Sequence, residues 1–505
     1  MTQQSNNNKT IIRNTIFMYF RMIVTIIIGL YASRVIINTL GIDGYGLYNI
    51  VGGIVVLFSF ISNALRNSTQ RFLSFELGKK ANYNIQKVFN SALQCHLYIC
   101  LGVLIFAETI GLWFTCTQLN IPSSQEYTVQ YVYQFSIITF ILQLIQVPYN
   151  SLIISYEKMG FYAYLSIIEA LMKLGILYFL VVLSFNKVIL YSALVSAVSL
   201  IVLVIYVCYC HKKLGLHKFQ KVTDNRVLKE IISFSKWSMF SGGSNILSQQ
   251  GGNYLVNIFS GVAANASFGI ANQVSNIIYG FVSNFQTAFQ PQIVKRYASN
   301  ETSLLMPLIM RSSLISYYLL LIIALPFCID TNYIIGLWLG IVPEYSGIFT
   351  VLLLVSFLID SIQAPLWMLI YSSGSIKRYT LITGVLTILN FPLSWLLLLL
   401  GLPIYSIFVV RVIISIICSA YRIKYVQKHE NFPVKIYIKE VLSRSLTVTF
   451  LSLSIILAIV FLLKSQILHI LFSICVIGII VLLTGFNKAD KNIIIKMILS
   501  KIPKL

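Results

Sequence analysis

The sequence predicts an all-α polytopic membrane protein with fourteen transmembrane helices. Hydrophobic residues make up 57% of the 505-residue chain and charged residues only 10%, whereas soluble proteins carry about 25% charged residues. Apolar stretches long enough to cross a bilayer, which needs about 20 helical residues, follow one another along the chain. The cations between these stretches gather in alternate loops. Together these observations exclude a soluble enzyme.

Fourteen apolar runs separated by short polar breaks are expected to form one helix each. They lie near residues 12–38, 45–75, 88–112, 129–155, 162–184, 188–210, 233–259, 264–288, 305–328, 346–371, 379–400, 403–425, 437–463 and 467–485. The loops on the predicted outer side are short, and the longest runs from residue 329 to 347. Its segment 334–340, with a tryptophan at 338, is expected to lie along the membrane interface.

The distribution of lysine and arginine predicts the orientation. Of the 37 cations, 28 fall in alternate loops and in the two terminal segments, while only Lys187 and Lys464 lie in the other loops. By the positive-inside rule, both termini are cytoplasmic. The net charge of +22 is then explained by orientation and by contact with anionic membrane lipids, so no nucleic-acid partner is expected.

Two short sequence echoes indicate an internal repeat. Residues 60–63 (Phe-Ile-Ser-Asn) resemble 281–284 (Phe-Val-Ser-Asn), and 46–49 resemble 269–272, both about 220 residues apart. Six spans separate the copies, an even number, so the repeat is parallel. We therefore expect two six-helix lobes in parallel repeat plus a C-terminal helix pair. The expected boundaries are 1–210 for the first lobe, 211–230 for a basic cytoplasmic linker, 231–428 for the second lobe, and 429–505 for the helix pair and basic tail.

Three arginines lie deep within predicted spans: Arg21, Arg66 and Arg411. An arginine at mid-membrane depth costs at least about 2.5–3.5 kcal/mol and normally faces a protein interior or a water-filled cavity. Around Arg66, polar residues recur at three- and four-residue steps and so share one helix face: Ser59, Asn63 and Gln70. This pattern predicts a cavity that attracts an anion.

Other arginines in the spans have a simpler interpretation. Arg71 and Arg311 lie near predicted cytoplasmic ends, and Arg34 lies towards an outer end. Long cationic side chains at such positions usually extend to the lipid headgroups. We therefore expect these three side chains to extend to the headgroups and to take no part in the cavity.

Two carboxylates within spans are candidate coupling residues, Asp360 and Glu169. Glu169 is four residues from Lys173 on one predicted helix, so a neutralising pair and a role in a cavity are both open. Asp360 lies mid-span with Gln363 nearby. It either pairs with an arginine or takes up a proton, and the sequence leaves both open.

Amide side chains are concentrated on the seventh and eighth spans. The set is Asn245, Gln249, Gln250, Asn253, Asn257, Asn272, Gln273, Asn276, Asn284 and Gln286. Hydrogen bonds between helices, at about 0.6–2 kcal/mol each, would explain some of them. So many on two neighbouring helices favours a wet cavity for hydroxyl-rich cargo, with Gln249, Asn253, Asn276 and Asn284 as candidate contacts. The cysteines and histidines form no C-x-x-C or H-E-x-x-H pattern, so no cofactor or metal is expected.

Several short motifs carry a resemblance to a known family. They are 13–15 (Arg-Asn-Thr), 40–46 (Leu-Gly-Ile-Asp-Gly-Tyr-Gly, where the family pattern is L-G-x-x-x-Y-G), 70–72 (Gln-Arg-Phe) and 335–338 (Ile-Gly-Leu-Trp). With fourteen spans in two lobes, the chain resembles polysaccharide flippases of the MOP superfamily, especially the Wzx-type translocases of O-antigen and exopolysaccharide units. The resemblance implies an inner-membrane transporter with a V-shaped cavity between lobes, which works by alternating access. It also implies an undecaprenyl-diphosphate-linked oligosaccharide as cargo and a glycan polymerase and chain-length proteins as partners.

The expected function is therefore transport of a lipid-linked oligosaccharide from the cytoplasmic to the periplasmic leaflet, without catalysis. Arg21, Arg66 and Arg411 would neutralise the diphosphate, and the asparagine and glutamine side chains would contact the sugar. Asn63 and Gln70 are counted among the candidate contacts. One alternative is a multidrug or cation antiporter of the same fold, which needs a cavity dominated by carboxylates. A second is a membrane glycan polymerase or ligase, which needs a larger outer loop than this chain offers.

Overall fold

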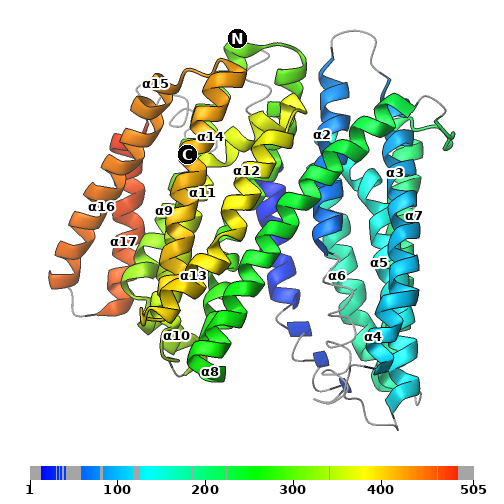
Figure 1. Ribbon diagram of the computed structural model, residues 1–505, viewed down its shortest axis with the longest axis horizontal. Helices are drawn as coiled ribbons and strands as arrows, with labels where there is room; N and C mark the ends of the chain where they lie inside the picture. The colour runs from blue at the N-terminus through cyan, green and yellow to red at the C-terminus, as the bar shows by residue number, and fades with distance from the viewer. Residues whose placement is uncertain are drawn as a thin grey trace, which may run out of the picture. The chain divides into compact units, whose positions relative to one another are not determined.

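The computed structural model describes residues 13–29, 59–79, 84–117, 125–182, 186–222, 225–340, 342–462 and 465–486, with three short pieces between 31 and 40. These residues are almost entirely helical and contain no strand (Figure 1). Ten helices among them are long and apolar enough to cross a membrane. The all-helical membrane class is thus confirmed. The count of fourteen stays a prediction, because the first two expected spans lie partly outside the described residues.

The helices follow the expected apolar runs closely. They are α2 (Ser59–Gly78), α3 (Ile85–Phe106), α4 (Leu112–Thr117), α5 (Glu126–Ser155), α6 (Met159–Val182), α7 (Lys187–Leu214), α8 (Asn225–Ala298), α9 (Thr302–Ile329), α10 (Thr331–Leu339), α11 (Ser346–Ser373), α12 (Lys377–Ile388), α13 (Asn390–Leu399), α14 (Ser406–Glu430), α15 (Val434–Tyr437), α16 (Ser443–Leu462) and α17 (Gln466–Ile480). Three π-helical turns continue them: η1 (Ala107–Gly111), η3 (Ile438–Leu442) and η4 (Val481–Gly485). Residues 13–29 form a further helical segment before α2.

The expected seventh and eighth spans form one element, α8, which is broken at Gly261. The backbone there has φ +76° and ψ −171°, a conformation that glycine adopts readily because it lacks a Cβ atom. Figure 1 shows the two green arms of α8 meeting at the end that carries the label. The break therefore turns one long apolar stretch into a helical hairpin.

The chain forms two compact units. Unit 1 comprises Met1–Gly243, Thr287–Glu301 and Tyr371–Leu381, and unit 2 comprises Ser244–Gln286, Thr302–Ile370 and Ile382–Leu505. Unit 1 thus includes both ends of α8 and the turn between α11 and α12, so its composition does not follow chain order alone.

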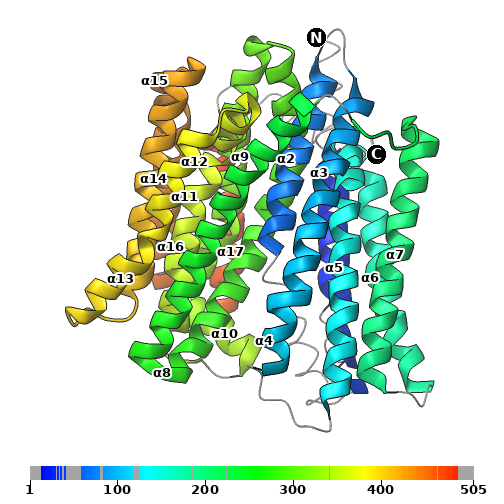
Figure 2. The same ribbon diagram turned by 45° about the vertical axis from the view of Figure 1, so that its right-hand side comes forward.

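Helix α5 lies at the centre of unit 1. It packs against α7, α2 and α3, and α6 packs against α7; Figures 1 and 2 show α3, α5, α6 and α7 side by side from two directions. The side chains of α5 are apolar around most of its circumference, as expected for a helix surrounded by others. A buried polar side chain on α5, such as Asn150 at 5% exposure, must therefore find its partners or a polar cavity inside the unit.

Unit 2 has an aromatic and aliphatic core. Phe268 from α8, Phe349 from α11 and Phe408 from α14 are buried together, with the Phe349 and Phe408 ring centroids 4.4 Å apart. The C-terminal helices α16 and α17 pack on each other and on α9. The segment expected at the membrane interface forms most of the short helix α10, which ends at Leu339 before Gly340, whose φ is +75°; its place at the interface stays a prediction.

The expectation for Arg71 was wrong. Its side chain is only 7% exposed, and it donates from Nε to the Tyr371 carbonyl at 3.2 Å and from Nη2 to the Ser372 carbonyl at 2.9 Å. These carbonyls belong to the last turn of α11, where helical N–H partners run out and the helix dipole favours a cation; the Tyr371 carbonyl also accepts from the Gly374 N–H at 3.2 Å. Gly374 follows with φ +80°, and a Cβ there would lie 2.5 Å from Nη2 of Arg71. Arg71 therefore caps a helix instead of extending to lipid.

We expect Arg71→Met to lower the stability of the purified protein by about 1.5–3 kcal/mol, the usual contribution of hydrogen bonds to a charged group. Arg71→Lys should recover only part, because an ammonium lacks the planar fork that reaches two carbonyls. The measurement is thermal unfolding in detergent. Arg226→Ala is the control, since that side chain is 86% exposed. Equal melting temperatures for wild type and Arg71→Met would contradict the capping role.

Candidate functional site

Unit 1 contains a polar cavity of about 350 Å³. Its wall comes from the N-terminal helical segment, α2, α5, α6 and α7. The lining residues are Arg21, Ser62, Arg66, Gln143, Gln146, Val147, Asn150, Tyr162, Ser166, Glu169, Ala170, Lys173 and Tyr206. Two of the three deep arginines predicted from the sequence, together with one candidate carboxylate, thus share one cavity.

The cavity carries an excess of positive charge. Arg21, Arg66 and Lys173 line it against a single carboxylate, Glu169. Arg21 donates from Nη1 to the Tyr162 hydroxyl at 3.1 Å. The Nε atom of Arg66 is buried and makes no hydrogen bond to any described residue. An anion entering the cavity would therefore find guanidinium donors in place.

The charged groups converge on Tyr206. This residue of α7 is 2% exposed, and its hydroxyl lies within electrostatic range of Tyr162, Glu169, Arg66 and Arg21. Four elements therefore direct polar groups at one point of unit 1. A ligand that contacts one of these groups lies near the others.

Helix α5 supplies three amide side chains that the sequence analysis missed. Gln143, Gln146 and Asn150 line the cavity; Asn150 is 5% exposed, and its Oδ1 accepts no hydrogen bond from the described residues. Their spacing of three and four residues places them on one helix face. That spacing was the available signal, but amides were sought on the seventh and eighth spans, where they are more numerous.

Of the polar face predicted on α2, only Arg66 lines the cavity. Ser59, Asn63 and Gln70 lie outside the lining, Asn63 exposed and Gln70 buried at 3% exposure, and Ser62, which the prediction did not include, lines it. Residues three apart on a helix diverge by about 60° around its axis. The part of the helix surface covered by residues at three- and four-residue steps is therefore wider than the part that lines the cavity.

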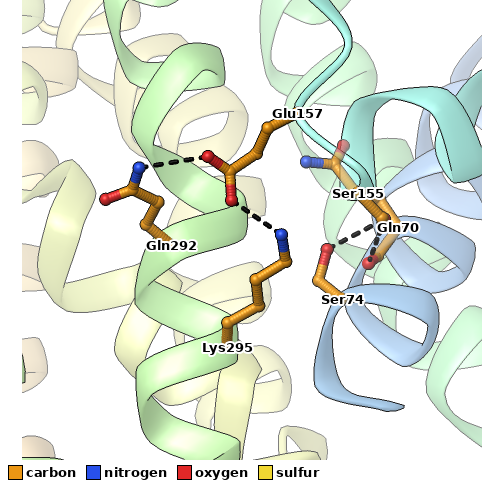
Figure 3. A network of polar contacts seen from close by, with 6 residues as sticks. All are labelled: Gln70, Ser74, Ser155, Glu157, Gln292 and Lys295. Carbon is orange, nitrogen blue, oxygen red and sulfur yellow. Dashed lines mark hydrogen bonds and ion pairs between the residues drawn. The ribbon is translucent and has the colours of Figure 1, made fainter. Parts of the chain in front are cut away.

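Figure 3 shows where Gln70 lies. Its carbonyl accepts a hydrogen bond from Ser155 Oγ at 3.4 Å, and that hydroxyl receives one from Ser74 Oγ at 2.9 Å. Close by, Glu157 pairs with Lys295 at 2.6 Å and accepts from Gln292 at 3.1 Å. These contacts join the end of α2 and the turn after α5 to the last turns of α8. Gln70 thus lies buried at a helix contact within unit 1, outside the cavity lining, and its side-chain Nε2 makes no hydrogen bond to the described residues.

Glu169 and Lys173 form the ion pair that their spacing allowed, with Oε1 and Nζ 2.6 Å apart. Both also line the cavity. The sequence left open a neutralising pair and a position in the cavity, and the structure shows both. The two side chains neutralise each other, and they do so in the wall of the cavity.

In unit 2 the remaining predicted charges have other neighbours. Asp360 lies within electrostatic range of Arg411 and Arg422. The guanidinium carbon of Arg411 is 5.4 Å from the centroid of the Phe357 ring, and Arg422 donates to the Gln363 carbonyl at 3.4 Å. Asp360 thus lies near two arginines, and its pairing with one of them and its uptake of a proton both stay predictions.

The amides predicted on α8 differ in exposure. Gln249 donates to Asn272 Oδ1 at 3.3 Å and so links the two arms of the hairpin. Asn253 is half-buried and Asn276 is exposed. Asn284 is 7% exposed and donates to the Gly280 carbonyl at 2.7 Å. Arg34 and the motif residues 41–46 lie outside the described residues.

Comparison with known proteins identifies the family. Residues 11–297 match the family described as "Polysaccharide biosynthesis protein". The chain belongs to this family of MOP superfamily flippases. No curated protein matches the chain. The family resemblance drawn from the sequence motifs is therefore confirmed.

Solved structures share the fold of this family member. A MATE transporter point mutant aligns with a TM-score of 0.70 at 13% identity, covering 86% of this chain and 97% of that one. A multidrug resistance MATE family transporter of the MOP superfamily, in an outward-facing conformation, gives 0.70 at 13% identity over 85% and 96%. A MOP superfamily transporter from Pyrococcus furiosus, titled for the reverse polarity of its binding pocket, gives 0.69 at 13% identity over 85% and 96%. The fold is thus that of MATE and MOP transporters.

Proposed function

We propose that this protein flips an undecaprenyl-diphosphate-linked oligosaccharide, such as an O-antigen, capsule or exopolysaccharide repeat unit, from the cytoplasmic to the periplasmic leaflet by alternating access. The observation that carries the proposal is the cavity of unit 1, where three cations face one carboxylate at membrane depth. No bond of the cargo is made or broken. The protein therefore acts as a transporter and not as an enzyme.

The diphosphate of such a lipid matches the cavity chemically. A diphosphate diester carries two negative charges, and guanidinium groups bind phosphate oxygens through paired hydrogen bonds. Arg21 and Arg66 supply these groups, and Gln143, Gln146 and Asn150 add amide donors and acceptors. The cavity volume of about 350 Å³ is at the small end for ligand sites, which range over about 300–1,000 Å³. It suits a charged headgroup, and a longer glycan would extend beyond it.

Amides of α8 are the proposed contacts for sugar hydroxyls. Gln249 and Asn276 are exposed and Asn253 is half-buried, while Asn284 has donated its amide to a backbone carbonyl within α8. We base the diphosphate assignment on Arg21 and Arg66, because Arg411 lies in unit 2 beside Asp360.

The loop cations support an inner-membrane location with both termini in the cytoplasm. A glycan polymerase and chain-length proteins are the proposed partners.

A multidrug antiporter is the second candidate, since the protein shares its fold with a multidrug resistance transporter. A cationic drug needs carboxylates that outnumber cations, and the cavity of unit 1 has the opposite balance. The Pyrococcus furiosus transporter, whose title links reversed pocket polarity to a different function, supports using polarity as the criterion. The polarity here favours an anionic cargo.

We expect Arg66→Ala to weaken cargo binding by roughly ten- to a hundredfold, the equivalent of about 1.5–3 kcal/mol for charge-assisted hydrogen bonds. Arg66→Lys should keep the attraction but recover only part of the activity, because an ammonium cannot bind two phosphate oxygens in a planar fork. The measurement is surface glycan in a flippase-deficient strain that carries each variant at matched membrane abundance.

Arg378, an exposed arginine in the first turn of α12, supplies the matched control, and Arg378→Ala should export glycan normally. If Arg66→Ala and Arg21→Ala both exported as much glycan as this control, the cavity of unit 1 would not be the cargo site.

Asp360 is the stronger candidate for proton coupling, since Glu169 lies in the cargo cavity itself. We expect Asp360→Asn to stop flipping driven by a pH gradient in proteoliposomes while cargo binding in unit 1 stays intact. Asparagine keeps the size of the side chain but cannot take up a proton as the carboxylate near Arg411 and Arg422 does in this hypothesis. Full gradient-driven flipping by Asp360→Asn would leave Asp360 with a structural role only.

A further inference from the structure

The Glu169–Lys173 pair occupies an unusual position for a neutralising ion pair. Its charged atoms are 2.6 Å apart, and neither side chain is sealed from the cavity, with exposures of 27% for Glu169 and 34% for Lys173. A pair needed only to neutralise a buried lysine would be most stable where no other ion could compete. This pair instead lies in the wall of the cavity that also holds Arg21 and Arg66.

Glu169 and an incoming phosphate compete for the same cation. Both are oxygen anions that accept charge-assisted hydrogen bonds, and the Lys173 ammonium has three donors on a flexible stem that can turn from one to the other. Glu169 and the two arginines all lie within electrostatic range of Tyr206. An anion held by the arginines is therefore near both members of the pair.

We propose that Glu169 is an internal competitor for the anionic substrate, a residue that keeps the affinity of the cavity low enough for release. In the empty cavity Glu169 holds Lys173. The substrate phosphates displace it on entry, and Glu169 takes Lys173 back as they leave. The lysine is thus never left without an anion at membrane depth, where an unpaired charge is costly. This role rests on the proposed function, because it assumes an anionic headgroup in the same cavity.

A purely structural pair makes the opposite prediction. If Glu169 only held Lys173 in place, Glu169→Gln would lower stability and leave anion affinity unchanged or reduced. A competitor predicts tighter binding, because Lys173 becomes available to the ligand and one negative charge is removed. The two roles therefore differ in the sign of the change in affinity.

The test uses the full-length protein in nanodiscs and P1,P2-dimethyl diphosphate as the probe, a dianion that has neither lipid nor sugar. Binding is followed by ³¹P NMR titration. Glu169→Gln should bind the probe about tenfold more tightly, the equivalent of one charge-assisted contact. Glu169→Asp, whose shorter side chain holds Lys173 less closely, should give a smaller gain. Glu169→Gln combined with Lys173→Met should lose the gain.

Glu108→Gln is the matched control, because Glu108 is also a glutamate within a predicted span but accepts its hydrogen bond from Gln134 at 3.2 Å, outside the cavity lining. It should bind the probe like wild type. In cells, Glu169→Gln should export less surface glycan than wild type at matched abundance, because tighter binding slows release.

Two results would overturn the proposal, and they are distinguishable. If Arg66→Ala weakens probe binding but Glu169→Gln and Glu169→Asp do not strengthen it, the cargo site stands and the competitor role falls. If neither wild type nor Glu169→Gln binds the probe, the diphosphate site and the competitor role fall together.

Discussion

The cost of placing charge inside an apolar bilayer is the constraint on which the rest of this structure depends. Charged side chains at depth normally have a partner or face a polar cavity. Arg71 caps the end of α11 through two carbonyls, Arg21 donates to Tyr162, and Lys173 pairs with Glu169. The pairing differs in kind between these sites. Hydrogen bonds to backbone carbonyls hold two segments together, whereas an ion pair that lines a cavity can exchange partners.

Helix α5 shows how the fold concentrates polarity. Because α5 packs against α2, α3 and α7, many of its apolar side chains are buried in unit 1, and its three amides differ in exposure, with Asn150 buried, Gln146 half-buried and Gln143 exposed. They line the same cavity as the cations. A wet site inside an apolar unit thus arises from one helix face meeting the charged faces of three neighbouring elements.

The shared fold and the cavity carry different information. The architecture is common to MATE and MOP transporters at about 13% identity, and a shared fold by itself does not indicate the cargo. The balance of charge in the cavity is a property of individual residues: one glutamate against two arginines and a lysine. That balance, and not the helix arrangement, separates an anionic from a cationic cargo.

The sequence by itself determined the helical membrane class and the family, and it allowed the pairing of Glu169 with Lys173, because apolar length and helical spacing are local properties. It also selected Arg21 and Arg66, since depth within an apolar run is readable along the chain. Only the tertiary structure decided that they share a cavity with α5, that Gln70 packs among helices, and that Arg71 caps α11. Those outcomes depend on contacts such as Arg71 with Tyr371, 300 residues apart, and no local pattern specifies which helix a side chain will meet.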